Sequence, residues 1–233
     1  MVLTGGFAPV SDRVWVWRYP VLDVNLSLVV GDAGALLVDT LSGPSQAREL
    51  ADGVRAVTSL PVRVVNTHAH FDHCFGNGVI AEVLGVEEFW AGPGVAQRLS
   101  GDTTELRERI VASYGHLDAV MAAELPALVP LPPNRLVEGV VELDLGGVVA
   151  RVWPVGHAHS PGDVVVACEG VVICGDIVEE GAPPQTGDAD VRGWVAALGR
   201  LLPEMTGPVV PGHGAVVDAA FVAAQMRDLE ALA

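Results

Sequence analysis

Apolar and polar residues alternate over several short stretches of the first third of the chain, which predicts β-strands because successive strand side chains point to opposite faces. A helix is predicted at 45–57, where apolar residues recur every three or four positions, with Ser45 as its N-cap. A second helix is predicted from 76 to 84, followed by a short strand at 88–91. The other strands of this half are expected at 14–18, 25–30, 35–39 and 62–66.

The middle of the chain is predicted to be helical. Residues 95–125 carry a helical pattern with breaks near Gly101 and Gly115. The proline-rich stretch PALVPLPP at 126–133 is interpreted as a linker. The helical segment 102–125 either caps a binding pocket or simply packs against the sheets, and its pattern does not separate the two.

After the linker the strand pattern resumes and then gives way to helices. An amphipathic helix is predicted at 189–202 and a terminal helix from Asp218. This order of elements favours an α/β fold of four layers, in which helices cover the outer faces of two mixed sheets. The strands of this half are expected at 135–143, 148–154, 164–168, 171–175 and 208–211.

The composition favours one domain with a sizeable core. The chain has 233 residues, half of them hydrophobic, so a single domain over 1–233 is expected. Its apolar stretches are too short for a membrane span, and the first residues have no signal-peptide pattern. The odd number of cysteines (Cys74, Cys168 and Cys174) has no disulfide-framework spacing. We therefore expect a cytoplasmic protein without membrane contact; a homo-oligomer is compatible with the sequence.

The charge balance excludes several kinds of chemistry. The net charge is −16, from 29 acidic and 13 basic residues, and all of the basic residues are arginine. The absence of lysine excludes a Schiff base and the lysine of a phosphate-binding loop. An acidic chain without a basic run also lacks the phosphate contacts that dominate nucleic-acid affinity. A small-molecule substrate is the expected partner.

Three of the seven histidines lie within six residues, in NTHAHFDHCFGN at 66–77. His68 and His70 are two positions apart at the end of a predicted strand, so their side chains can project the same way toward one metal ion. Asp72 and His73 follow in the expected loop. Such histidines could also form a surface tract or satisfied core residues. Imidazole and carboxylate ligands together suit zinc, iron or manganese.

Three later stretches place further candidate ligands where loops leave strands. They are VGHAHSPGD at 155–163, VVICGDIV at 171–178 and VVPGHGAVV at 209–217. Their histidines and aspartates stand beside glycine, which lets the backbone approach a site closely. The candidates are His157, His159, Asp176 and His213.

At this point the sequence resembles the metallo-β-lactamase-fold hydrolases. The family's H-x-H-x-D-H signature resembles residues 68–73, and its later histidine loop, G-D element and P-G-H-G element resemble AHSPGD, Gly175-Asp176 and 211–214. The resemblance covers nearly the whole chain in the family's order. It implies an αβ/βα sandwich with a two-metal site at the edges of the sheets.

The resemblance also implies a division of the ligands, with Asp176 bridging two divalent ions. Zinc is the first expectation for both, with iron or manganese as alternatives. Asp163, four residues after His159, either fixes an imidazole or is an ordinary turn carboxylate. The ligands of the first metal would be His68, His70 and His159, and those of the second Asp72, His73 and His213.

The expected reaction is hydrolysis of a carbonyl compound, such as an ester, lactone, thioester or amide. A metal-bridging hydroxide would attack the carbonyl, and Asp72 would orient it and pass its proton to the leaving group. The acids of the loop 179–190 would repel an anion and favour a neutral substrate.

Three alternatives remain. A persulfide-dioxygenase-like enzyme would use one iron. A β-lactamase is the second alternative, although the best-known subclass carries cysteine at the position of Asp176. A non-enzymatic metal-binding protein is the third, and it would be expected to lack some of the ligands.

Overall fold

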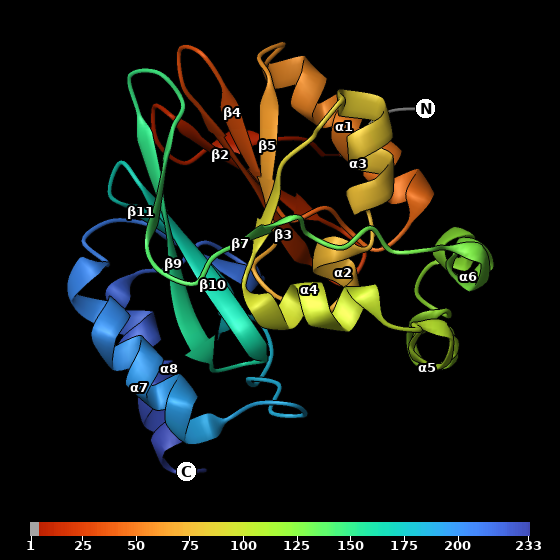
Figure 1. The fold of residues 1–233 in the computed structure, drawn as a ribbon. Coiled ribbons are helices and arrows are strands. Elements are labelled where there is room, and N and C mark those ends of the chain that lie inside the picture. Colours follow the sequence, from red (N-terminus) through yellow and green to blue (C-terminus); the bar gives the residue numbers. More distant parts are fainter. Residues whose placement is uncertain (1–4) are drawn as a thin grey trace.

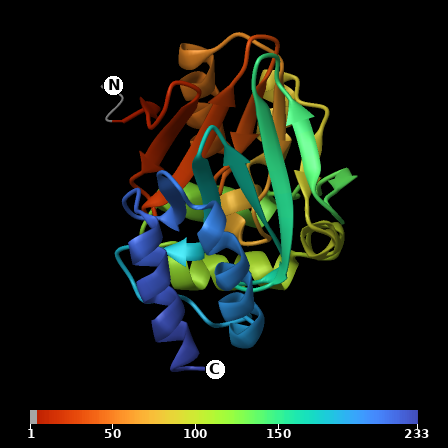
Figure 2. The ribbon, with the colours of Figure 1, turned by 90° about the vertical axis from the view of Figure 1, so that its left-hand side faces the viewer.

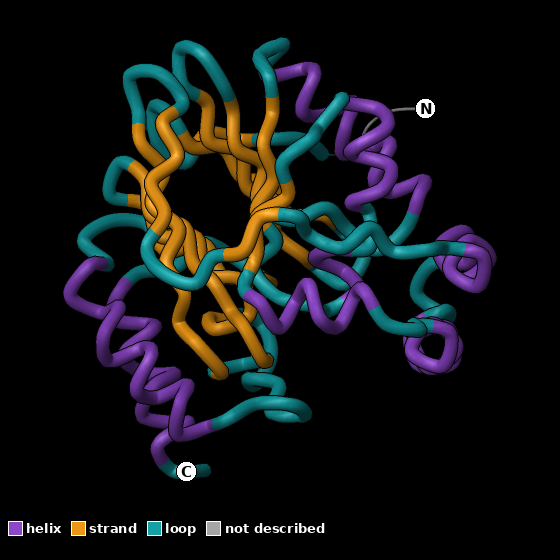
Figure 3. The backbone as a smooth tube through the Cα atoms, viewed as in Figure 1, coloured by secondary structure: helices purple, strands orange, loops and turns teal. Residues whose placement is uncertain are grey.

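The computed structural model describes residues 5–233 and has two groups of strands packed face to face, with helices on both outer sides (Figure 1, Figure 3). The N-terminal strands are covered by helices α1 (Pro44–Val57) and α3 (Asn77–Leu84). The C-terminal strands are covered on the opposite side by α7 (Val191–Leu201) and α8 (Ala219–Glu230) (Figure 2). The order of layers is thus helix, sheet, sheet, helix.

The N-terminal half supplies the first sheet and its covering helices. Its predicted strands and helices are present, together with the two-residue strand β1 and the four-residue helix α2, which the pattern did not predict. The elements are β1 (Ala8–Pro9), β2 (Val14–Tyr19), β3 (Val24–Val30), β4 (Ala35–Val38), α1 (Pro44–Val57), β5 (Val62–Val65), α2 (Phe71–Cys74), α3 (Asn77–Leu84) and β6 (Phe89–Ala91).

The C-terminal half supplies the second sheet and its helices. The strand predicted at 135–143 is divided into a two-residue and a four-residue strand, with residues 137–140 between them. Two other strands run three or four residues further than their apolar pattern predicts. The elements are β7 (Arg135–Leu136), β8 (Val141–Asp144), β9 (Val149–His157), β10 (Pro161–Cys168), β11 (Val171–Glu179), α7 (Val191–Leu201), the short 3₁₀ helix Leu202–Glu204, β12 (Val209–His213) and α8 (Ala219–Glu230).

The two groups of strands are hydrogen-bonded into one continuous path. Its order is β7-β6-β5-β4-β3-β12-β11-β10-β9-β8, with β2 paired to β3 and β1 paired to β2. The halves meet between β3 and β12, where a single pair, Val24 and His213, is in register. A candidate ligand therefore lies at the junction of the two sheets.

Three apolar layers hold the sandwich together, and single strands contribute to two of them. In β4, Leu36 and Val38 lie in the core between the sheets, whereas Ala35 and Leu37 face α1 and α3. In β10, Val165 faces α7 and α8, and its neighbours on either side face the other sheet. Both faces of these strands are buried, as expected for sheets covered on both sides.

The predicted helical segment consists of three helices separated near the two predicted glycine breaks. They are α4 (Pro93–Ser100), α5 (Thr104–Tyr114) and α6 (Ala119–Glu124), and a 3₁₀ turn at Leu125–Ala127 follows. In Figure 1, α5 and α6 lie outside the four layers. Arg107 ties α5 to this turn by hydrogen bonds to the carbonyls of Leu125 and Pro126.

The predicted N-cap of α1 is wrong. The helix begins at Pro44, with Gly43 in the N-cap position, so Ser45 already lies inside it. Ser45 instead donates hydrogen bonds from its backbone N and its Oγ to the Glu124 carboxylate. That carboxylate lies at the positive end of the α1 dipole, and it anchors α6 to the sandwich.

The three cysteines are buried and free. Within the part of the chain that the structure describes, no helix combines the length and apolar character needed to cross a bilayer.

Candidate metal centre

The histidine stretch follows β5, at the point where the chain leaves the first sheet. His68 and His70 lie in the connection between β5 and α2, and Asp72 and His73 lie inside α2 rather than in a loop as expected. The helical turn is closed by the backbone bond from the His73 N–H to the His70 carbonyl, 3.1 Å. It carries Asp72 and His73 away from the preceding pair, toward a second group of ligands.

The other three candidates come from neighbouring strands of the second sheet. His159 follows the end of β9, Asp176 lies within β11, and His213 is the last residue of β12. Glycine makes this close approach possible: a Cβ on Gly212 would overlap Asp176 Oδ1. Gly175 has a φ of +54°, and a Cβ there would lie 2.6 Å from the Thr67 side chain, so both positions require glycine.

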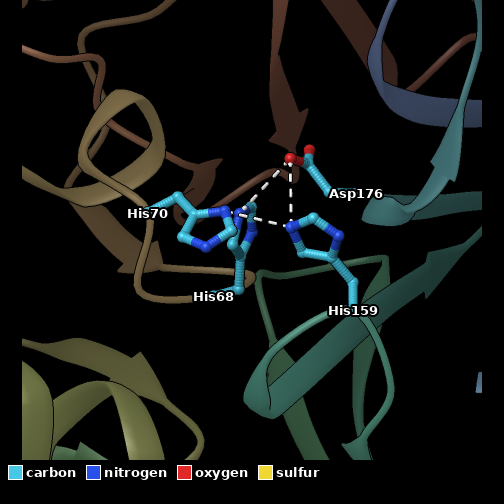
Figure 4. A group of neighbouring side chains, drawn as sticks. All are labelled: His68, His70, His159 and Asp176. Atoms are coloured by element: carbon cyan, nitrogen blue, oxygen red, sulfur yellow. Dashed lines mark hydrogen bonds and ion pairs between the residues drawn. The ribbon is translucent and has the colours of Figure 1, made fainter. Parts of the chain in front are cut away.

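His68, His70, His159 and Asp176 form the first group of possible ligands (Figure 4). Their nearest ligand atoms all lie within 4.8 Å of one another. Asp176 Oδ2 is 3.4 Å from His68 Nε2 and 3.5 Å from His159 Nε2. His159 Nε2 is also 3.0 Å from His70 Nδ1. Three imidazoles thus converge on one point from two different sheets.

Asp72, His73 and His213 form the second group. His213 Nε2 is 3.3 Å from His73 Nε2 and 3.5 Å from Asp72 Oδ2. Asp176 also contacts this group: its Oδ1 is 3.2 Å from His73 Nε2 and its Oδ2 is 3.3 Å from His213 Nε2. One carboxylate therefore lies between the two groups.

Each of the five imidazoles has its second nitrogen beside an oxygen atom outside the cluster. Hydrogen bonds in this position fix the ring orientation and the tautomer of a metal-binding histidine. Four of the five contacts are hydrogen bonds, whereas His159 Nδ1 faces Glu179 at ion-pair distance without one. The pairs are His68 Nδ1 with Thr67 Oγ1 (3.0 Å), His70 Nε2 with Asp188 (3.1 Å), His73 Nδ1 with Asp39 (2.8 Å), His159 Nδ1 with Glu179 (3.4 Å) and His213 Nδ1 with the Leu22 carbonyl (2.8 Å).

The sequence did not point to Asp39, Glu179 and Asp188 as partners of these imidazoles. Asp39 lies 34 residues before its partner and Asp188 lies 118 residues after its own, so no local spacing links them. The one usable signal was a carboxylate at the end of a predicted strand, which applies to Asp39.

Asp163 orients the ligand loop and not an imidazole ring. Its carboxylate accepts hydrogen bonds from the backbone N–H groups of Ala158 and Ser160, on either side of His159, and from Ser160 Oγ. His157 stays outside the cluster, where its Nε2 is bonded to the Asp188 carbonyl at 2.7 Å. Of the two histidines in this loop, His159 is the one that reaches the site.

The charges of the cluster follow from burial and from the central carboxylate. Burial lowers the pKa of His68 well below its usual range and that of His159 to about 4. Burial also opposes the charge on His213, but Asp176 outweighs it and raises the pKa of His213 to about 9. Burial likewise disfavours the Asp176 carboxylate, yet His73 and His213 hold its pKa well below the usual range. An ionised Asp176 carboxylate therefore lies beside two neutral imidazoles, His68 and His159, and beside His213, whose raised pKa favours the protonated form.

The residues present fit a metal centre. Among residues 5–233, the buried atoms without a hydrogen-bond partner include His68 Nε2 and Asp176 Oδ1, and both lie inside the cluster. Unpartnered buried polar atoms are costly, and bound cations would satisfy them. Five imidazoles and two carboxylates are a donor set suited to zinc.

A cavity of about 750 Å³ opens directly on the cluster. His70, Asp72, His159, Asp176 and His213 all line it. Its remaining walls come from the segment after β2, from α5 and from the loop after β11, and include Leu22, Asp23, Phe71, Leu106, Arg109, Ile110, Ser113, Tyr114, Glu179, Glu180, Ala182, Gln185 and Asp188. The pocket is large enough for a small molecule.

Truncation of Glu179 is expected to weaken metal binding by the first group of ligands. Glu179 is buried, and its carboxylate is the group that faces the outer nitrogen of His159. We expect Glu179→Ala to lower zinc affinity about 10- to 100-fold, the usual effect of removing such a partner. Competition with a chromophoric chelator measures this, with Glu142→Ala on exposed β8 as the control. An affinity within about twofold of the wild type would show that Glu179 does not support the ligand.

The fold and the cluster together define an α/β protein with a histidine- and aspartate-rich site of the kind that binds metal. The model of the family described as the metallo-beta-lactamase superfamily matches residues 19–213. The chain belongs to this superfamily, as its motifs predicted. Comparison with curated proteins gives no match.

Solved structures of metallo-beta-lactamases share the fold. A metallo-beta-lactamase from Pontibacter korlensis is 20% identical, with a TM-score of 0.74 over 97% of this chain and 99% of that one. DIM-1, in a crystal exposed to ceftazidime, is 17% identical, with a TM-score of 0.74 over 98% of each chain. FIM-1 from Pseudomonas aeruginosa, in its mono-zinc form, is 17% identical, with a TM-score of 0.70 over 98% of this chain and 96% of that one. The predicted fold is thereby confirmed.

Proposed function

We propose that this protein is a metal-dependent hydrolase that holds two divalent ions and cleaves a carbonyl compound of small size. The observation that carries the proposal is the position of Asp176, whose carboxylate lies within 3.5 Å of four imidazoles from both groups of ligands. A carboxylate in this position can hold two cations at once.

In this proposal each group of ligands holds one ion, and Asp176 contributes to both. When bound, the ions would supply a water molecule of lowered pKa and polarise a carbonyl oxygen. The first set is His68, His70 and His159, and the second is Asp72, His73 and His213.

The protein's own contribution is to orient these groups and to hold a proton. Asp72 lines the cavity and is 6% exposed, so its carboxylate can take a proton from the attacking water and deliver it to the leaving group. The apolar wall formed by Phe71, Leu106 and Ile110 covers one side of the cavity and limits access of bulk water.

The complete second group favours hydrolysis over the single-iron alternative. A persulfide dioxygenase-like reaction would need only one iron, held by histidines of the first group and Asp176. It would leave Asp72, His73 and His213 without a metal, although these residues are brought to within 4.8 Å of one another. Cleavage of β-lactams is one form of the proposed hydrolysis, because the fold neighbours are metallo-beta-lactamases.

A panel of esters, lactones, thioesters and β-lactams tests the proposal on zinc-loaded protein. We expect turnover of at least one class, its loss after removal of metal by a chelator, and its return with zinc or manganese. Oxygen uptake with glutathione persulfide is measured in parallel on iron-loaded protein. Persulfide oxidation without hydrolysis of any class on the panel would replace the proposal with the oxygenase.

A further inference from the structure

One face of α5 forms a wall of the cavity. The pocket-lining residues of this helix are Leu106, Arg109, Ile110, Ser113 and Tyr114. Their spacing of three, one, three and one places all of them on the same side of an α-helix. Tyr114 also packs on Phe71, with ring centroids 5.4 Å apart, which brings this face next to the metal-ligand helix α2. The wall is apolar except for Arg109 and Ser113.

The acidic residues of the pocket rim are already paired within the protein. Asp23 accepts two hydrogen bonds from Arg18, at 2.5 and 2.6 Å. Glu180 accepts from the backbone N–H of Ala215 at 2.6 Å. Asp188 lies between His70 Nε2 at 3.1 Å and Arg98 at 3.7 Å.

The loop 179–190 therefore repels an anion less than its composition suggested. Glu179 is buried against His159, and Asp190 caps the N-terminus of α7 by accepting from the Gly193 N–H. Every acid of this loop has a hydrogen-bond or ion-pair partner, and Asp188 also lies 3.7 Å from the Arg98 guanidinium.

Among the described residues, Arg109 is the one arginine that lines the cavity. It is exposed and forms no ion pair or side-chain hydrogen bond with residues 5–233. A guanidinium presents its N–H donors in a planar fork that matches a carboxylate. It is also the only positively charged side chain, apart from the histidines, among the described residues that line the cavity.

We propose that Arg109 binds a carboxylate of the substrate, which makes the substrate an anionic carbonyl compound with an apolar body. This inference rests on the proposed function for the identity of the reacting group. The carbonyl lies at the metal centre, the apolar body lies along Leu106 and Ile110, and the carboxylate reaches the α5 wall. Arg109 thereby determines specificity from the α5 wall of the pocket.

Matched pairs of p-nitrophenyl esters test this assignment. Half-esters of adipic, suberic and sebacic acid scan the unknown spacing, and each is compared with the ester of the monocarboxylic acid of equal length. We expect at least one half-ester to have a roughly tenfold higher kcat/KM than its neutral counterpart. Arg109→Gln removes that preference, mainly by raising KM for the half-ester.

The control variant is Arg48→Gln, which makes the same charge change on the exposed side of α1, away from the cavity. It is expected to retain the preference. Equal effects of Arg109→Gln on both esters of each pair, or an unchanged preference, would overturn the assignment.

A binding measurement separates this proposal from the proposed function. If no ester is hydrolysed, calorimetric titration with hexanoate and hexanamide still tests the site on protein as purified. Tighter hexanoate binding in the wild type, weakened several-fold in Arg109→Gln but not in Arg48→Gln, supports the carboxylate site. Equal hexanoate affinity in the wild type and Arg109→Gln contradicts it.

Discussion

Replacing Asp176 by asparagine is expected to lower kcat/KM by roughly a thousandfold or more. This is the equivalent of about 4 kcal/mol of transition-state stabilisation, within the range that metal ions supply. Asp176 is the residue that lies against both groups of ligands, and asparagine keeps its shape but removes the charge that offsets two cations. We expect metal content, measured by elemental analysis, to fall together with activity.

The matched control is Asp190→Asn, which makes the same chemical change at the N-cap of α7 in the loop beside the site. Asparagine is as good an N-cap as aspartate, so this variant should keep both fold and metal. Full metal content and wild-type turnover in Asp176→Asn would show that the carboxylate does not join the two groups.

Asp72→Asn is expected to separate proton transfer from metal binding. Asparagine can still offer an oxygen to the second group, but it cannot accept the proton of the attacking water. Because general acid–base catalysis usually contributes about 10²- to 10⁴-fold, we expect kcat to fall by that order while most of the metal is retained. The measurement is kcat and metal content on the same preparation.

A leaving group of low pKa provides the second readout for Asp72. If the leaving group of an ester needs no proton, its hydrolysis by the asparagine variant should be partly restored toward the wild-type rate. Hydrolysis of an alkyl ester should not be restored. An equal loss for both kinds of ester would limit Asp72 to a structural or ligand role.

Most of the fold was predictable because its elements keep the simple periods of buried strands and amphipathic helices. The errors lie where function interrupts those periods. β9 was expected to end at 154 and β11 at 175, but they run on to His157 and Glu179. In β11, Asp176 and Glu179 break the apolar pattern because they face the cavity, although the backbone remains in the sheet.

Local pattern also failed for the shortest elements. A single turn such as α2 is too short to show a helical period, so Asp72 and His73 were expected in a loop. Ser45 had the right residue type for an N-cap, but Pro44 begins the helix one residue earlier, and the serine bonds to Glu124 from a distant helix.

The candidate ligands were predictable, whereas the residues that orient them were not. His68 to His73 form one compact motif, and His159, Asp176 and His213 lie in or directly after the apolar strand patterns of the second sheet. Contacts such as those of Glu179 with His159 or of the Leu22 carbonyl with His213 depend on the packing of two sheets, and sequence spacing does not encode them. The same holds for Arg109, whose place in the pocket depends on how α5 folds over the cluster.

The central claim is that the two groups of ligands hold two divalent ions that serve one hydrolytic reaction. Elemental analysis of protein purified without added metal tests it most directly, because each group of ligands binds one ion in this account. We predict approximately two ions per chain, mainly zinc or manganese. A single iron per chain with little other metal, together with oxygen uptake on a persulfide, would contradict the account and assign the site to oxygen chemistry.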